Sequence, residues 1–206
     1  IRVNGVEVAA TRGTPLLSLN SRYNLLTKTE QFDDAFWTKG NATVTANTSV
    51  APDGTTTADK LVENTATAEH RVQGNITFSA APFTASTYFK AAERSFAFIR
   101  LDDAGSSKYA YFDLATGTIG TVTSGLTAFI ENIGDGWYRC AARFNTPAAG
   151  SGSVVFASTT ANGTNSYTGD GTSGIFIWGA QLIVTDSLAF NAYQRVNTVT
   201  DFDFAA

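Results

Sequence analysis

Hydrophobic and polar residues alternate with a period of two along most of the chain beyond residue 58. This alternation is typical of strands that turn one face toward a core and the other toward solvent. Gly, Asp, Asn, Ser and Pro, which favour turns, separate the alternating segments. The strands predicted in this way are Ala58–Glu63, His70–Phe78, Ser86–Ala91, Phe96–Asp102, Tyr109–Leu114, Thr127–Asn132, Trp137–Asn145, Ser153–Ser158 and Ile175–Val184. We therefore predict an all-β fold, a jelly-roll β-sandwich of two antiparallel sheets.

The segment Gly169–Val184, GDGTSGIFIWGAQLIV, is the predicted centre of this sandwich. Gly171 and Gly174 can supply the positive φ angles that a tight reversal needs. The residues that follow are apolar on both faces, as in a strand that lies in the middle of a sheet. Trp178 is therefore expected to be deeply buried, with room for its packing at the small pair Gly179-Ala180.

The two ends of the chain lie outside the predicted sandwich, which spans residues 23–190. Residues 1–22 contain one short alternating strand around Asn4-Gly5 and a small apolar patch at Leu16, Leu17 and Leu19, too little to fold alone. We predict an N-terminal arm whose patch is buried between chains, and an extended C-terminal tail over residues 191–206. The chain begins with Ile1 and contains no Met, so we expect it to be a piece of a longer polypeptide.

Composition narrows the range of partners. Charged residues make up 16% of the 206 residues and the net charge is −4, which predicts no general affinity for nucleic acid. No apolar run reaches the length of a membrane helix, and no signal-peptide pattern opens the chain. The single cysteine, Cys140, lies in a predicted strand and is interpreted as a small buried residue rather than a reactive thiol.

Residues with catalytic chemistry are sparse. His70 is the only histidine, and its place in a strand between Glu69 and Arg71 indicates ordinary strand polarity. The candidate carboxylates, which lie in turn-like sequences, are Asp33, Asp34, Asp102, Asp103, Asp135 and Asp170. Asp is favoured there because it accepts hydrogen bonds from nearby backbone amides. No zinc or EF-hand spacing is present, so we predict no enzyme activity, no metal and no cofactor. A structural calcium is in keeping with sandwich lectin-like modules, but no spacing here indicates one.

One predicted strand face mixes aromatic rings with charged side chains. Its candidate glycan-binding residues are Tyr88, Lys90, Arg100, Tyr111, Asp113 and Arg139. Rings stack on the apolar faces of sugars, and charged groups bond their hydroxyls, so we expect Tyr88, Arg100, Tyr111 and Arg139 to share one shallow groove. The alternative is a network of cross-strand ion pairs that needs no ligand. The opposite face is wholly apolar and predicted as core: Phe89, Ala91, Ile99, Leu101, Phe112, Leu114, Cys140, Ala142 and Phe144.

Five segments together resemble a domain of tailed-phage and prophage virion proteins. They are NLLTKTEQFDDAFWTKGNATVTANTSVAPDGTTTADKLVE (24–63), TYFKAAE (87–93), YFDLATGTIG (111–120), GDGWYRCAARF (134–144) and GDGTSGIFIWGAQL (169–182). They occur in the family's order over about four fifths of the chain. The family often has Glu after Gln-Leu, whereas Ile183 follows Gln181-Leu182 here. Residues 1–22 lie outside the resemblance.

The resemblance implies a jelly-roll, carbohydrate-binding-like domain of a tail fibre, tail or head-spike protein. It implies a non-catalytic module on the virion surface, outside the cell, that contacts host-surface polysaccharide and other virion proteins, and a homotrimer organised by the N-terminal arm. A purely structural virion domain is the alternative function, and a polysaccharide depolymerase domain is a minor one. Glycan binding predicts that the mixed face is exposed and concave, a structural role predicts that it is covered, and an enzyme needs a carboxylate pair in a groove.

Overall fold

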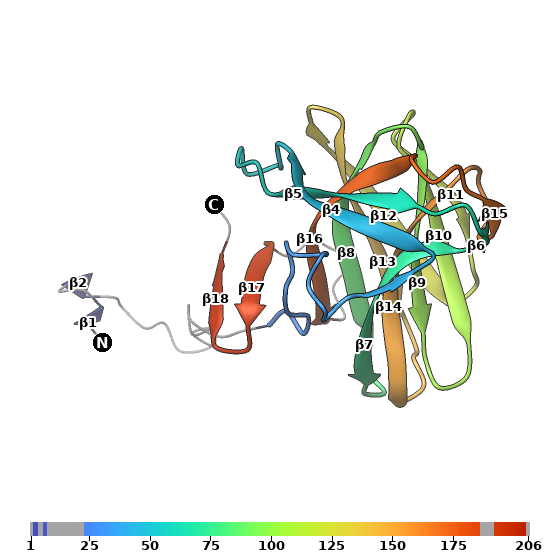
Figure 1. Ribbon diagram of the computed structural model, residues 1–206. Coiled ribbons are helices and arrows are strands. Elements are labelled where there is room, and N and C mark those ends of the chain that lie inside the picture. Colours follow the sequence, from blue (N-terminus) through green and yellow to red (C-terminus); the bar gives the residue numbers. More distant parts are fainter. Residues whose placement is uncertain (1, 4–5, 8–22, 186–191, 205–206) are drawn as a thin grey trace.

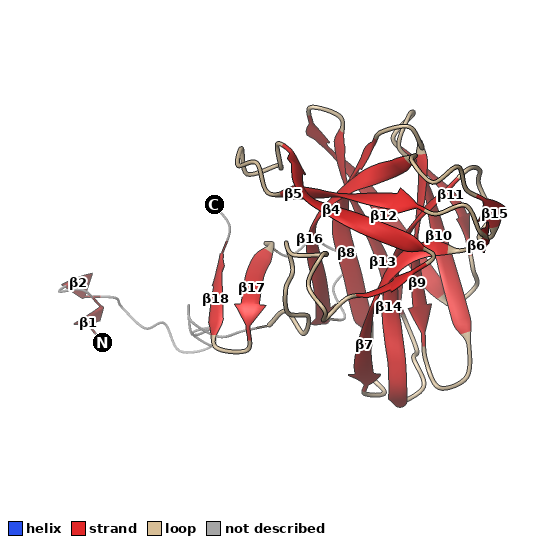
Figure 2. Cartoon of the chain, in the orientation of Figure 1, coloured by secondary structure: helices blue, strands red, loops and turns tan. Residues whose placement is uncertain are grey.

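The computed structural model describes residues 2–3, 6–7, 23–185 and 192–204. Every regular element in these ranges is a strand, and none is a helix that could span a membrane. Two six-stranded antiparallel sheets pack face to face, which confirms the predicted all-β sandwich (Figure 2).

The first sheet has the strand order β11-β10-β9-β14-β7-β3. Its strands are β3 (Thr38–Gly40), β7 (His70–Phe78), β9 (Phe96–Asp102), β10 (Ser107–Asp113), β11 (Thr118–Val122) and β14 (Gly150–Thr159). The second sheet has the order β12-β13-β8-β16-β5-β4. Its strands are β4 (Ala42–Ser49), β5 (Ala58–Glu63), β8 (Phe83–Ala91), β12 (Leu126–Gly134), β13 (Trp137–Phe144) and β16 (Gly174–Val184). The chain crosses between the sheets several times, as in jelly-roll-like folds (Figure 1).

The main core fills the space between the two sheets. Phe89 of the second sheet meets Phe156 of the first with ring centroids 6.2 Å apart, and Phe78 meets Phe83 at 4.9 Å. All nine residues predicted for the apolar face belong to this core or pack against it, with Ala91 only partly buried. Period-two alternation therefore identified the inward faces of β8, β9, β10 and β13 correctly.

The central strand of the second sheet is β16, between β8 and β5. Trp178 on this strand is 2% exposed, which confirms its predicted burial. Its ring points away from the main core and packs against Tyr88 and Tyr193 on the outer face of the sheet. Gly179 has a φ of 67°, and a Cβ there would lie 2.8 Å from the Tyr88 ring, so glycine permits this close packing.

The C-terminal segment differs from the prediction. Residues predicted as an extended tail form a hairpin, in which β17 (Gln194–Thr198) pairs with β18 (Asp201–Phe204). The alternation in QRVNT supports a strand, and Val196 is fully buried. Near the N-terminus β1 (Arg2–Val3) pairs with β2 (Val6–Glu7), and a further short pair joins β6 (Thr67–Ala68) to β15 (Tyr167–Thr168). The predicted apolar patch at Leu16, Leu17 and Leu19 lies outside the described residues.

Candidate functional site

The six predicted glycan-binding residues lie on two different sheets. Tyr88 and Lys90 of β8 and Arg139 of β13 share the outer face of the second sheet. Arg100 of β9, with Tyr111 and Asp113 of β10, belongs to the first sheet. The prediction of one shared groove is therefore wrong. Alternation assigns a residue to a face of its own strand, but it carries no information on which sheet the strand joins.

On the first sheet the charged residues pair with one another. Arg100 binds the Glu69 carboxylate, with Nη1 2.6 Å from Oε2, and its Nε lies 2.9 Å from Asp102. Asp113 accepts the backbone N–H groups of Ala115 and Thr116 and so closes a turn. Arg100 therefore forms ion pairs, as the alternative prediction has it, but with Asp102 of its own strand and with Glu69 just before β7 rather than across neighbouring strands, and Asp113 has a turn-forming role.

The ring of Tyr111 on the first sheet is also enclosed. It stacks on Tyr109 with centroids 6.0 Å apart and lies beside Phe98. Burial, followed by the proximity of Tyr109 and Glu69, raises the pKa of Tyr111 to about 12. With 5% of the residue exposed, little ring surface remains for stacking on a sugar.

On the second sheet the cations lie over aromatic rings. The Arg139 guanidinium is 5.5 Å from the centre of the Tyr88 ring, and Lys90 Nζ is 5.9 Å from that of Trp137. Tyr88 and Arg139 are 8% and 6% exposed. Trp137 and Trp178 donate their indole N–H groups to the Val50 carbonyl and the Thr57 hydroxyl. This face is covered rather than open.

Part of the cover comes from the connection between β4 and β5, and part from the segments through which the chain enters and leaves the sandwich. The Asn24 side chain donates to the carbonyls of Ala180 and Gln194 and accepts the N–H of Leu182. The Gln194 side chain accepts the N–H groups of Tyr23 and Asn24. Tyr193 packs on Tyr88 and Trp178. Residues 23–26 and 192–196 therefore lie side by side next to the C-terminal half of β16, and Tyr193 covers part of the outer face.

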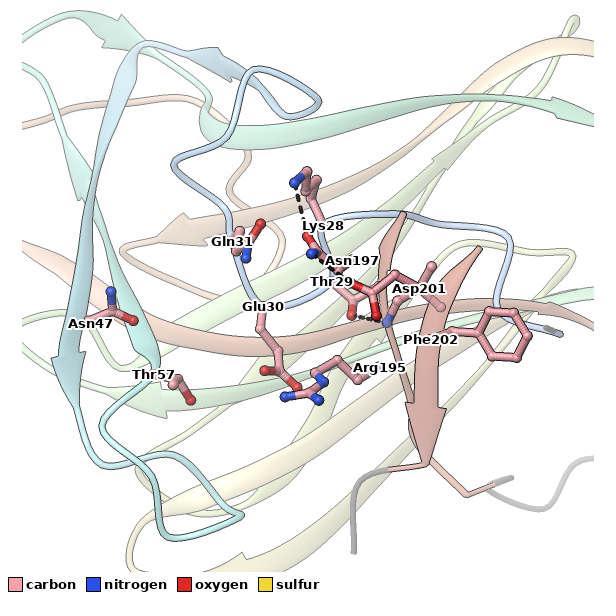
Figure 3. A pocket seen from close by; sticks show the side chains of 11 residues that line it. Lys28, Thr29, Glu30, Gln31, Asn47, Thr57, Arg195, Asn197, Asp201 and Phe202 are labelled. Carbon is pink, nitrogen blue, oxygen red and sulfur yellow. Dashed lines mark hydrogen bonds between the residues drawn. The ribbon is translucent and has the colours of Figure 1, made fainter. Parts of the chain in front are cut away.

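A pocket of about 350 Å³ opens next to these segments (Figure 3). Its walls come from the turn at residues 28–31, Asn47 of β4, Thr57 and the hairpin of β17 and β18. Charged side chains in the lining are Lys28, Glu30, Arg195 and Asp201, and amide side chains are Gln31, Asn47 and Asn197. Phe202 also belongs to the lining, but its ring points away from the other lining side chains (Figure 3). The lining therefore offers mainly hydrogen-bond donors and acceptors.

Hydrogen bonds join the turn to the hairpin and so fix the pocket walls. Lys28 Nζ donates to Asn197 Oδ1 at 2.9 Å, and Asn197 in turn donates to Asp201 at 2.9 Å (Figure 3). Thr29 N–H donates to the Val196 carbonyl, and Val196 N–H donates to Thr29 Oγ1 at 3.0 Å. Since these contacts join residues 28–29 to residues 196–201, the pocket exists only when the hairpin is docked.

The residues considered for catalysis have structural contacts. His70 is fully buried in β7, with Nδ1 2.6 Å from the Asn41 carbonyl and Nε2 3.2 Å from that of Tyr167. Asp103 and Asp170 accept backbone N–H groups of their own turns, as predicted. Cys140 is fully buried, and burial raises the pKa of its thiol. Within the described ranges no group of three His, Cys, Asp or Glu side chains could hold a metal.

No family model matches this chain, and no curated protein matches it. The functional assignment therefore rests on the contacts within the structure and on the resemblance of the five segments described above. The pocket was missed from the sequence because its walls come from four segments that lie far apart in the chain. The polar runs TKTEQ at 27–31 and QRVNT at 194–198 were the signals available, but neither predicts that they meet.

Proposed function

We propose that this chain is a non-catalytic β-sandwich module of a phage tail fibre or spike, and that it binds host-surface glycan in the pocket between residues 28–31 and the β17–β18 hairpin. The observation that carries the proposal is the polar lining of this pocket. Its volume of about 350 Å³ lies within the range of small-ligand sites. The resemblance of the five segments to a virion domain supports the biological setting.

The lining also indicates a class of glycan. Sugar hydroxyls both donate and accept, and the side-chain amides of Gln31, Asn47 and Asn197 can do the same. Two cations and two carboxylates line the pocket, so its formal charges cancel. We therefore expect a neutral sugar unit, held by hydrogen bonds to these side chains.

A glycan array followed by calorimetry tests this proposal. Gln31→Ala and Asn47→Gly each remove one side-chain amide, and glycine suits the φ of 56° at position 47. We expect each change to weaken binding by about 1–2 kcal/mol, the value of one or two hydrogen bonds. Gln73→Ala removes an amide from the first sheet, away from the pocket, and should leave affinity unchanged. Equal affinity in all four proteins would place the glycan elsewhere.

The second candidate function is a purely structural virion module. Its supporting observation is that the chain enters and leaves the sandwich side by side, with Tyr23 N–H 2.8 Å from the Gln194 side-chain oxygen. A module joined to its neighbours at one end, with its mixed faces covered, needs no ligand. In this case the array shows no binding. The proposed homotrimer is tested separately by sedimentation: trimming residues 1–22 should yield monomers, and a monomeric intact chain at micromolar concentration would contradict it.

A further inference from the structure

Asp59 is a buried carboxylate that joins two walls of the pocket without lining it. The residue lies in β5 and is 1% exposed. Its Oδ2 accepts the N–H of Phe32 at 2.8 Å, and its Oδ1 accepts the N–H of Asn47 at 2.9 Å. Phe32 directly follows Gln31 of the turn, and Asn47 itself lines the pocket. The two oxygens therefore hold two separate parts of the pocket wall.

The backbone at Asn47 needs this support. Asn47 lies where the β4–β5 register shifts between Thr45 and Ser49, and its φ is 56°. A residue in a bulge has lost its ladder partner, and a non-glycine residue with positive φ is strained. The hydrogen bond from the Asn47 backbone N–H to Asp59 replaces the missing ladder contact. It therefore fixes the backbone at Asn47 and, with it, the direction of the side-chain amide that lines the pocket.

Two charged residues, Asp33 and Lys39, act on the Asp59 carboxylate. Asp33, in the turn that precedes β3, adds a repulsive carboxylate, and Lys39 in β3 is the cation that acts on the same group. Lys39 Nζ itself donates to the Asp33 carbonyl at 2.7 Å. From the neighbouring strands, β16 places Ile177 opposite Asp59, and β4 contributes the N–H of Asn47. Within the described ranges no cation forms an ion pair with Asp59.

We infer that Asp59 is the positioning residue of the pocket and that its protonation loosens the wall at Phe32 or Asn47, so that glycan affinity falls in mild acid. This inference rests on the proposed function. A carboxylate accepts from both N–H groups with charged oxygens, whereas in a neutral carboxyl group one oxygen becomes a hydroxyl, a weaker acceptor, so one of the two hydrogen bonds weakens. Burial, with a smaller contribution from Asp33, raises the pKa of Asp59 to about 6, so the change occurs in a mildly acidic range.

The experiment is an NMR titration of the full chain between pH 7.5 and pH 5. The amide signals of Phe32 and Asn47 should shift with a midpoint near pH 6 in the parent and not in Asp59→Asn. Asp103→Asn is the matched control, because Asp103 also accepts backbone N–H groups but in a turn away from the pocket. That variant should keep the parent titration. Amides that show no such midpoint in the parent would overturn the inference.

Binding is measured in the same samples with D-glucose, D-galactose and N-acetylglucosamine as probes. We expect the Kd of a binding sugar to rise about tenfold from pH 7.5 to pH 5 in the parent and in Asp103→Asn, and to be independent of pH in Asp59→Asn. An unchanged Kd in the parent overturns the inference and leaves the proposed function intact. Titrating amides without binding of any sugar or array glycan support the positioning role and overturn the proposed function.

Discussion

The two ends of strand β5 carry two buried carboxylates with opposite surroundings. Asp59 and Glu63 are each 1% exposed and lie on the same side of the strand as Leu61 of the main core. Glu63 binds Arg94 through both oxygens, with Oε2 2.9 Å from Nε, and accepts the Tyr167 hydroxyl and the Asp170 N–H. Asp59 accepts the backbone N–H groups of Phe32 and Asn47, and within the described ranges no side chain donates to it.

This difference reverses the direction of the pKa shift. Burial opposes ionisation at both residues. At Glu63 the hydrogen bonds from Arg94, Tyr167 and Asp170 outweigh burial, so its pKa lies below the usual value. At Asp59 burial dominates and raises the pKa to about 6. Burial alone therefore does not determine how a carboxylate titrates; the balance between burial and the hydrogen bonds and charges that reach the carboxylate does.

The two ends consequently differ in what they do. The contacts of Glu63 fasten the loop that carries Tyr167 and Asp170 to the sandwich. Asp59 joins the turn before Phe32 to the bulge at Asn47 through bonds that depend on its charge. The Glu63 end of β5 is held by a carboxylate that is paired with Arg94. The Asp59 end is held by a carboxylate that mild acid protonates.

The largest loss of stability is expected on β16, the strand that pairs with β5. There the substituted residue is apolar, and its effect can be compared with those of the two carboxylates. Trp178 is 2% exposed between Tyr88 and Tyr193. Trp178→Ala should lower the free energy of unfolding by about 3–5 kcal/mol, because it leaves a cavity. Urea denaturation measures this. A Trp178→Ala variant that still unfolds cooperatively, with a Tm within a few degrees of the parent, would show that the cluster around Trp178 does not stabilise the fold.

The next effect is at the Glu63 end. Arg94→Ala leaves the Glu63 carboxylate buried without its cation, and we expect a loss of about 3 kcal/mol at pH 7. Adding Glu63→Gln to this variant should restore part of the loss, because it removes the buried charge. Lys60→Ala, also on β5, is the control: its pair with Glu93 is solvent-exposed on the Glu93 side, and the change should stay within about 0.5 kcal/mol. Equal losses of stability in Arg94→Ala and Lys60→Ala would contradict the stabilising role given to the Arg94–Glu63 pair.

The smallest effect is the pH dependence that separates the two ends. The pKa of Asp59 rises from an ordinary 3.8 to about 6 on folding, so the fold prefers its protonated form. Its contribution is therefore most favourable below pH 4, and the free energy of unfolding should fall by about 1–2 kcal/mol as the pH rises from 4 to 6. Glu63 acts in the opposite sense: its stabilisation is present above its ordinary pKa of 4.5 and is lost in stronger acid.

Variants separate these two slopes in urea denaturation between pH 3 and pH 7. Asp59→Asn should remove the fall between pH 4 and pH 6 and keep the loss in stronger acid. Arg94→Ala combined with Glu63→Gln should do the reverse. A parent whose stability increases steadily from pH 4 to pH 6, with the same slope in Asp59→Asn, would contradict the role given to Asp59.

Much of the sandwich could be predicted from the sequence, because period-two alternation is a local signal. The predicted bounds of β5, β7 and β9 agree with the structure. Assignment of strands to sheets depends on crossovers, which leave no local pattern, and so the predicted glycan-binding residues were placed in one groove although they lie on two sheets.

The pattern of β5 itself shows where the sequence becomes ambiguous. In ADKLVE, one face carries Asp59, Leu61 and Glu63, and the other carries Ala58, Lys60 and Val62. Each face holds both apolar and charged residues, so hydrophobicity does not identify the inward one. The carboxylates are inside because Arg94, Tyr167 and two backbone N–H groups reach them from distant segments. The pocket was unpredictable for the same reason.

The most direct test of the contrast between the two ends is a carbon-13 NMR titration of the side-chain carboxyl groups of Asp59 and Glu63 in the full chain. Our account predicts a midpoint near pH 6 for Asp59 and a midpoint below the ordinary 4.5 for Glu63. A midpoint for Asp59 at or below 3.8, or one for Glu63 above 4.5, would contradict it.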